Sequence, residues 1–140
     1  MLCEEIMKRN VECVTPKDNA QTAARKMREA NVGFLPVCDD AKKVLGTITD
    51  RDIAIRMVAD GKPASTLVSD LMTKDVVACR PKDDIKKAEQ AMGQKQKSRI
   101  LCTDDAGKLI GVISLSDIAQ RDNGGVAQTM RAVTQRETRA

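Results

Sequence analysis

The chain repeats itself at a fixed offset. Shifting the sequence by 65 residues aligns positions 6–57 with 71–122 without a gap, and 17 of the 52 aligned pairs are identical. The identities include the turns Pro16-Lys17-Asp18 and Pro81-Lys82-Asp83. Two copies are too few for a solenoid, so we expect two like units related by a pseudo-twofold axis. We place the first copy at residues 1–64, the second at 65–122 and a basic amphipathic tail at 123–140.

The two copies predict the same order of elements, β-α-β-β-α, which is a mixed α/β (α+β) fold. Short β-prone runs at residues 11–14 and 76–79 end at a proline. A helix follows, for which we expect Asp18 or Asp83 as N-cap, Gln21 in the capping-box position and Gly33 as the stop in the first copy.

A hairpin and a final helix complete each predicted copy. The hairpin strands are residues 34–38 and 44–48, then 100–103 and 109–113, and Gly107 in the second turn is expected to need a positive φ. We expect Ser69 to cap the turn that opens the second copy. The final helices are expected to bury Ile53, Ala54 and Met57 in the first copy, and Ile118 and Ala119 in the second.

The absence of several residue types excludes most catalytic chemistry. The chain has no His, no Trp, no Tyr and one Phe. It therefore has no imidazole base, no His-bearing metal site and no aromatic platform for stacking nucleic-acid bases. Asp50 with Asp52 and Asp117 with Asp122 are conceivable acid–base pairs, but no nucleophile or metal-ligand set accompanies them. We expect a protein that is not an enzyme and holds no metal.

The remaining composition favours a cytoplasmic protein that binds neither nucleic acid nor a membrane. The net charge is only +4, the acidic N-terminus does not resemble a secretion signal, and the longest apolar run is far shorter than a membrane span. Five cysteines without a C-x-x-C pair indicate reduced, packed thiols. A redox role remains open for Cys13 and Cys38, which are candidates for neighbouring strands of one sheet.

The same motif follows the last strand of each copy. Residues 46–52 and 111–117 both read glycine, two residues, a hydroxyl residue, two residues, aspartate. At a strand-to-helix junction, Thr49 or Ser114 adds a hydroxyl to free backbone N–H groups, and ionised Asp52 or Asp117 accepts from both hydroxyls of a ribose. The glycine admits either a ligand or a neighbouring strand. The same spacing is also an ordinary helix cap, so each motif alone is ambiguous.

Residues 1–122 resemble a tandem pair of CBS domains, also called a Bateman module. The resemblance rests on Leu35-Pro36-Val37, the two glycine-to-aspartate motifs, and the openings Ile6-Met7 and Leu71-Met72. It implies two motifs packed sheet to sheet, assembly into a homodimer, and clefts between the sheets for AMP, ADP, ATP, NAD or S-adenosylmethionine. It also implies a regulatory role. The candidate ligand-binding residues are Thr49, Asp52, Ser114, Asp117, Thr15, Arg51, Pro36, Val37, Arg80 and Arg99.

The resemblance assigns roles to some of these residues. Thr49 and Ser114 would contact ribose or phosphate, and the two aspartates the ribose hydroxyls, while strand residues near Thr15, Pro36 and Val37 would surround the base. The second copy lacks the Pro-Val pair and has Arg80 where the first has Thr15, so the two sites are expected to be unequal.

A second reading is a ligand-free dimerisation or adaptor module that regulates a protein partner. The tail carries Val126, Met130 and Val133 on one helical face beside Arg131 and Arg136. That face suits either a protein partner or the chain's own dimer mate.

Overall fold

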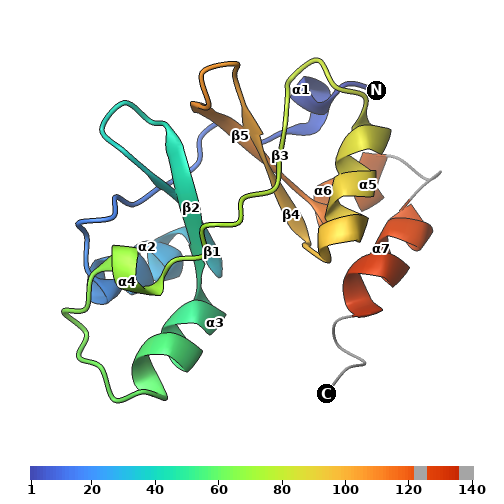
Figure 1. The fold of residues 1–140 in the computed structure, drawn as a ribbon. Helices are drawn as coiled ribbons and strands as arrows, with labels where there is room; N and C mark the ends of the chain where they lie inside the picture. Colours follow the sequence, from blue (N-terminus) through green and yellow to red (C-terminus); the bar gives the residue numbers. More distant parts are fainter. Residues whose placement is uncertain (122–125, 136–140) are drawn as a thin grey trace. The chain divides into compact units, whose positions relative to one another are not determined.

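The computed structural model of the 140-residue chain describes residues 1–121 and 126–135. Its elements follow the predicted alternation of helices and strands, with a short additional helix at the start of each copy (Figure 1). The elements of the first copy are α2 (Ala20–Ala30), β1 (Phe34–Cys38), β2 (Val44–Thr49), α3 (Asp50–Ile53) and the π-helical turn η1 (Ala54–Val58). Those of the second are β3 (Ala78–Cys79), α5 (Ile85–Lys95), β4 (Arg99–Thr103), β5 (Leu109–Ser114) and α6 (Leu115–Arg121). The opening helices are α1 (Cys3–Ile6) and α4 (Val68–Leu71), and the tail helix is α7 (Val126–Thr134). The chain is thus a mixed fold of helices and strands.

The chain forms two compact units that exchange their opening segments. The first unit comprises residues 11–76, and the second comprises residues 1–10 together with the chain from residue 77 onward. The helix α4 therefore packs with the first repeat, and α1 packs with the second. Each compact unit therefore contains the opening segment of the other sequence repeat.

Each unit has its own apolar core, to which the exchanged helix contributes. In the first unit, Val68 and Leu71 of α4 are fully buried among residues of α2, β1 and β2. In the second, Cys3 and Ile6 of α1 are buried against β4, β5, α5 and α6. Because each large buried aliphatic side chain stabilises the fold by roughly 1.5–3 kcal/mol, these short helices are integral to the units they join.

The sheets are built on the two predicted hairpins. Strands β1 and β2 are antiparallel, with Phe34 opposite Thr49, and β4 and β5 repeat this pairing with Arg99 opposite Ser114. The predicted first strand is short: β3 pairs in parallel with β4, and in the first unit only Val14 bridges to Val37. Gly107 has the expected positive φ of 82°, and Lys42, at the same place in the first hairpin turn, has a φ of 65°.

Several predicted helix signals lie one or two residues from where the structure uses them. The N-caps are Asn19 and Asp84, not Asp18 and Asp83. Asp18 and Asp83 instead accept the backbone N–H groups of Thr15 and Arg80, both at 2.9 Å, and so close the turns that contain the prolines. The cap consequently passes to the next residue.

Two further predictions of helix boundaries are wrong. Asn31, not Gly33, takes the left-handed conformation that ends α2, with a φ of 55°, since asparagine tolerates this region. Ser69 lies inside α4, whose N-cap is Leu67.

The final helices are less buried than their apolar residues indicate. Ile53 and Met57 are half-buried and Ile118 is fully buried, whereas Ala54 and Ala119 are exposed. In the first unit, Ile55 and Val58 are 53% and 64% exposed. The η1 turn therefore presents apolar side chains to solvent in this chain.

The tail helix packs on its own unit. Helix α7 lies against α5, and a Cβ on Gly93 would come within 3.2 Å of the Cβ of Ala132. Thr129 and Val133 are buried, whereas Met130, which shares the predicted apolar face with Val133, is 47% exposed. The side chains of Val126 and Arg136 lie outside the described residues.

Candidate functional site

The first strand-to-helix junction is a reciprocal hydrogen-bonded cap. Thr49 ends β2 and begins the turn into α3. Its hydroxyl oxygen accepts the N–H of Asp52 at 3.0 Å, while Oδ2 of Asp52 accepts the N–H of Thr49 at 3.0 Å. One oxygen of the Asp52 carboxylate is thus committed to holding the junction.

The second junction has the same construction. The Ser114 hydroxyl accepts the N–H of Asp117 at 3.1 Å, and Oδ2 of Asp117 accepts the N–H of Ser114 at 2.9 Å. Ser116, which has no hydroxyl counterpart in the first junction, places its own Oγ 2.9 Å from that of Ser114. The predicted hydroxyl–carboxylate pair is therefore brought together in both copies.

The other carboxylate oxygen of each aspartate faces the exchanged opening segment. Oδ1 of Asp52 accepts the Thr73 hydroxyl at 3.4 Å and lies 3.9 Å from Nε of Arg56. Oδ1 of Asp117 lies 3.5 Å from Nζ of Lys8, which occupies the repeat position equivalent to Thr73. The two aspartate side chains are only 13% and 14% exposed. The two Oδ1 atoms, called the outer oxygens below, are thus held by longer contacts than the Oδ2 atoms in the caps.

The opening segment crosses each hairpin at its glycine. Thr73 exchanges two backbone hydrogen bonds with Thr47, at 2.8 and 2.9 Å, and Lys8 makes the same exchange with Val112. A Cβ on Gly111 would lie 2.8 Å from the carbonyl oxygen of Lys8. Of the two reasons for glycine left open by the sequence, the structure shows the close approach of a neighbouring strand.

Sequence reasoning missed the arginines that hold the opening helices. Nη1 of Arg56 donates to the carbonyl oxygens of Leu71 and Met72 at 3.2 and 3.1 Å, and Arg121, its repeat equivalent, donates to that of Glu5 at 2.9 Å. The signal was available, because Arg56 and Arg121 are one of the identical pairs of the repeat. Thr73 and Lys8 gave no such signal, since they differ between the copies.

Thr15 and Arg80 lie at the other end of the hairpins. Val14 pairs with Val37, whereas Thr49 pairs with Phe34, so Thr15 and Thr49 are separated along β1 by about 10–13 Å. Arg80 donates to the hydroxyl of Thr103 and its Nε lies 3.7 Å from Asp105, so its guanidinium is held on the second hairpin.

The remaining predicted site residues differ in exposure. Pro36 and Val37 are buried in β1, and the Pro36 carbonyl accepts the N–H of Val14 at 3.0 Å. Arg51 is exposed in the first turn of α3. Arg99 is half-buried and is the strand partner of Ser114, which places it next to the second junction.

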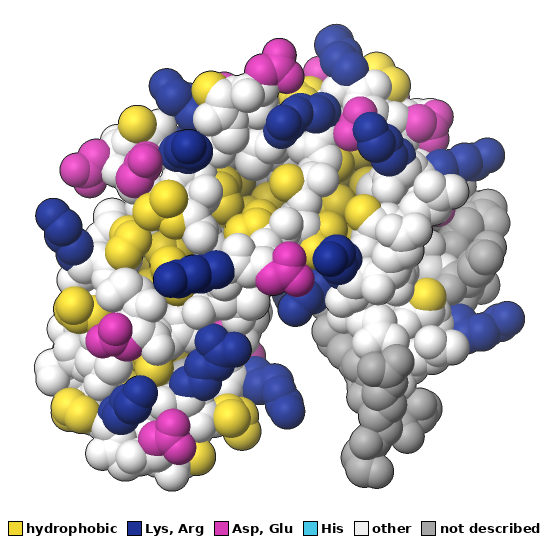
Figure 2. Space-filling model, viewed as in Figure 1, with side chains coloured by type: hydrophobic (Ala, Val, Ile, Leu, Met, Phe, Trp, Pro, Cys, Tyr) yellow, Lys and Arg dark blue, Asp and Glu magenta, His cyan; other side chains and the backbone are white. Residues whose placement is uncertain are grey.

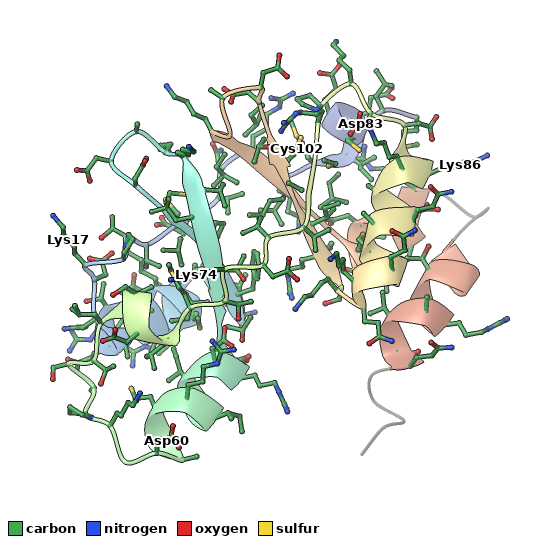
Figure 3. The ribbon with its side chains drawn as sticks, in the orientation of Figure 1. Lys17, Asp60, Lys74, Asp83, Lys86 and Cys102 are labelled. Atoms are coloured by element: carbon green, nitrogen blue, oxygen red, sulfur yellow. The ribbon has the colours of Figure 1, made fainter. Side chains whose placement is uncertain are left out.

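The cysteines form two groups of contacting thiols. Cys13 and Cys38 are hydrogen-bonding neighbours in the first unit, as expected for adjacent strands, and burial followed by the Cys13 thiol raises the pKa of Cys38 to about 12. In the second unit, hydrogen bonds with Cys102 and Cys3, followed by burial, raise the pKa of Cys79. Cys102 and Asp83 lie at the same end of this unit (Figure 3). The second group occupies the positions that Val14, Val37 and Val68 hold in the first unit, which is a packing role.

A hollow of about 490 Å³ lies between α2 and the start of α3. It is lined by Arg28, Asn31, Gly33 and Asp50, among others, and not by Thr49 or Asp52. The hollow is therefore adjacent to the first junction without including its hydroxyl–carboxylate pair.

Charge is dispersed over the face of the molecule that Figure 2 shows. Figure 2 shows Lys and Arg side chains separated by acidic and apolar ones rather than gathered into one patch. Among the described residues, no His, Cys, Asp or Glu side chains form a group of three or more placed to hold a metal ion. No helix in the described part of the chain has the length and apolar character needed to cross a membrane.

Comparisons with known proteins agree with this architecture. The sequence profile of the CBS domain matches residues 3–59 and 68–124. The CBS domain-containing protein YhcV of Bacillus subtilis is 35% identical over 116 residues, which are 83% of this chain and 81% of that protein. The chain spans 60% of the length of another relative, the uncharacterized protein MK0525 of Methanopyrus kandleri, which is 32% identical over 117 residues, 83% of this chain.

Solved structures share the fold. The crystal structure of Hypoxic Response Protein I with two coordinated zinc ions has a TM-score of 0.79 and 29% identity, and covers 86% of this chain and 98% of that one. The structure of CBSX2 in complex with AMP has a TM-score of 0.75 at 22% identity, and covers 93% of this chain and 98% of that one. With two matched domains and this shared fold, the chain belongs to the CBS domain family.

Proposed function

We propose that this chain is a regulatory module that senses an adenosine-containing ligand through its two strand-to-helix junctions. The observation that carries the proposal is that the two carboxylate oxygens of Asp52, and those of Asp117, make different contacts. In each, Oδ2 holds the cap at 2.9–3.0 Å, while Oδ1 makes only longer contacts, 3.4 Å or more, to the opening segment. A ligand hydroxyl replaces these outer contacts without opening the cap.

The chemistry of the outer oxygen suits a ribose. An ionised carboxylate is an acceptor only, so it takes the hydroxyl protons of a cis-diol. Beside it, the Thr49 hydroxyl uses its oxygen in the cap, and no acceptor among the described residues takes its proton. That proton is available to a phosphate or ribose oxygen. AMP, ADP, ATP, NAD and S-adenosylmethionine all carry a ribose, and AMP is the ligand named for one structure of the same fold.

The test is calorimetric titration of these five ligands, with Asp52→Asn and Asp117→Asn as the variants. Asparagine keeps one side-chain oxygen for the cap and loses the charge at the outer position. Because a hydrogen bond to a charged group contributes about 1.5–3 kcal/mol, we expect each substitution to weaken binding at its own junction roughly 10–100-fold. Unfolding in urea is the control for an intact cap. Absence of heat with every ligand, in a folded wild-type protein, contradicts the proposal.

An assembly module is the second candidate, favoured by the apolar surface of η1. Ile55 and Val58 are 53% and 64% exposed, and both belong to the first unit. We expect Ile55→Asp with Val58→Asp to lower the molar mass measured by light scattering if this surface joins two copies, and matched Ile55→Ser with Val58→Ser variants to lower it less. An unchanged mass for the aspartate variant rules this surface out as a dimer contact.

A further inference from the structure

The two junctions differ in charge where the opening segment crosses them. The first is crossed by Thr73-Lys74-Asp75, whose formal charges cancel, and the second by Lys8-Arg9-Asn10, whose formal charge is +2. Both segments have the same backbone pairing to their hairpins, so the difference lies in the side chains alone. Figure 3 labels Lys74 on the segment that follows α4.

The ammonium of Lys8 forms an ion pair with the second junction's carboxylate. Its Nζ lies 3.5 Å from Oδ1 of Asp117, in the place where the first junction has the Thr73 hydroxyl. The Lys8 side chain is 75% exposed. An ion pair this exposed contributes about 0–1 kcal/mol, so Lys8 leaves Asp117 at little cost when a stronger anion arrives.

Two other cations of the second unit are held by contacts of their own. Arg121 donates to the Glu5 carbonyl, and Arg80 is held by Thr103 and Asp105 at the far end of the hairpin. Lys8 differs from these two arginines because its side chain reaches Asp117 directly, so it can reach a group bound there without giving up a backbone contact. In the first unit, the corresponding position is neutral.

From the pairing of Lys8 with Asp117, and of Thr73 with Asp52, we propose that Lys8 makes the second junction selective for a nucleoside di- or triphosphate, while the first junction is less sensitive to phosphate charge. The inference rests on the proposed ribose contact. When the ribose hydroxyls occupy Oδ1 of Asp117, the displaced ammonium pairs with the phosphate chain of the same ligand. A lysine is suited to this role because its charge is compact and its stem is flexible.

The test exchanges the two residues that the repeat places at the same position. The variants are Lys8→Thr, Thr73→Lys and, as a second variant that keeps side-chain length, Lys8→Gln. The probes are ATP and adenosine, titrated by calorimetry at two salt concentrations without added divalent cation. Asp117→Asn identifies which set of sites belongs to the second junction.

We expect Lys8→Thr and Lys8→Gln to weaken ATP binding at the second junction about 3–10-fold and to reduce its salt dependence, with adenosine unchanged. Thr73→Lys is expected to strengthen ATP binding at the first junction by a similar factor. Equal ATP affinity in wild type and in both Lys8 variants overturns the inference while leaving the ribose proposal intact. If wild type binds neither ATP nor adenosine, the proposed function fails and the inference fails with it.

Discussion

A Cβ atom on Gly46 would lie 2.6 Å from the carbonyl oxygen of Thr73, because the opening segment of the second repeat pairs with the first hairpin at this residue. The equivalent Cβ on Gly111 would lie 2.8 Å from the carbonyl oxygen of Lys8 and 2.9 Å from Sδ of Met7. Because each motif glycine has no side chain, the exchanged segment can lie close to the hairpin beside the carboxylate. The segment in turn supplies the contact to Oδ1 of that carboxylate.

Substitution of Gly46 by alanine is expected to destabilise the protein by about 1–3 kcal/mol, as other overpacking substitutions do. The backbone oxygen of Thr73 has no rotamer by which to move aside. Urea unfolding measures the change, and Leu45→Ala on the same strand, with a side chain that is 36% exposed, is the matched control. A Gly46→Ala protein as stable as wild type means that the opening segment does not pair here.

The hairpin turns provide a second prediction. Lys42 and Gly107 are repeat equivalents with φ values of 65° and 82°, a region that costs a side-chain-bearing residue about 1 kcal/mol. Lys42→Gly is therefore expected to raise the free energy of unfolding by up to about 1 kcal/mol, and Gly107→Lys to lower it by a similar amount. Lys43→Gly, next in the chain and without a positive φ, is expected to lower it. Stabilisation by Lys43→Gly as well contradicts a conformational origin.

The N-cap at the start of α2 gives a third prediction. Asn19 accepts the N–H of Thr22 at 2.9 Å, so Asn19→Ala removes a helix cap and is expected to cost about 0.5–2 kcal/mol. Asn19→Asp keeps an acceptor and is expected to restore most of that stability; the repeat itself uses aspartate at the equivalent Asp84. Urea unfolding of the three proteins checks the order. If the aspartate variant is as unstable as the alanine variant, Asn19 does not act through its cap.

The repeat allowed the order of elements, the hairpins and the pairing of Thr49 with Asp52 to be predicted, because each of these depends on neighbours close in sequence. A capping box spans four residues and a hairpin about fifteen, and both patterns occur twice. The positive φ of Gly107 was predicted from the same local turn chemistry. The N-cap was assigned to Asp18 and not to Asn19 because two adjacent residues with similar side chains compete for a turn and a cap.

The exchanged segments could not be read from local patterns. Lys8 and Asp117 are separated by most of the chain, and no short-range pattern brings them together. The second unit has cysteines at the positions of Val14, Val37 and Val68 of the first unit. This exchange is visible in the sequence only after the repeat is aligned, and the contact between the cysteines is visible only in the packed unit. Burial of η1 was overestimated because helical spacing shows which residues share a face, but not whether anything covers it.

Because of Cys38, the free energy of unfolding is expected to fall as pH rises in the alkaline range. Burial, followed by the neighbouring Cys13 thiol, raises the pKa of Cys38 from 9.0 to about 12. Above pH 9 the unfolded chain loses this proton while the folded chain keeps it, so the unfolded state is favoured as pH rises. The contribution of this group to the free energy of unfolding is constant below about pH 8 and falls by up to about 1.4 kcal/mol per pH unit between 9.0 and about 12.

The measurement is urea unfolding under reductant from pH 7.5 to about 10.5, for wild type and Cys38→Val. Valine replaces the thiol with an apolar group that cannot ionise, so its curve is expected to be shallower above pH 9 by most of the slope assigned to Cys38. Below pH 8 the two curves should run parallel, since the thiol is protonated in both states there. Identical slopes for wild type and Cys38→Val above pH 9 mean that the Cys38 thiol ionises as readily in the folded protein as in the unfolded chain.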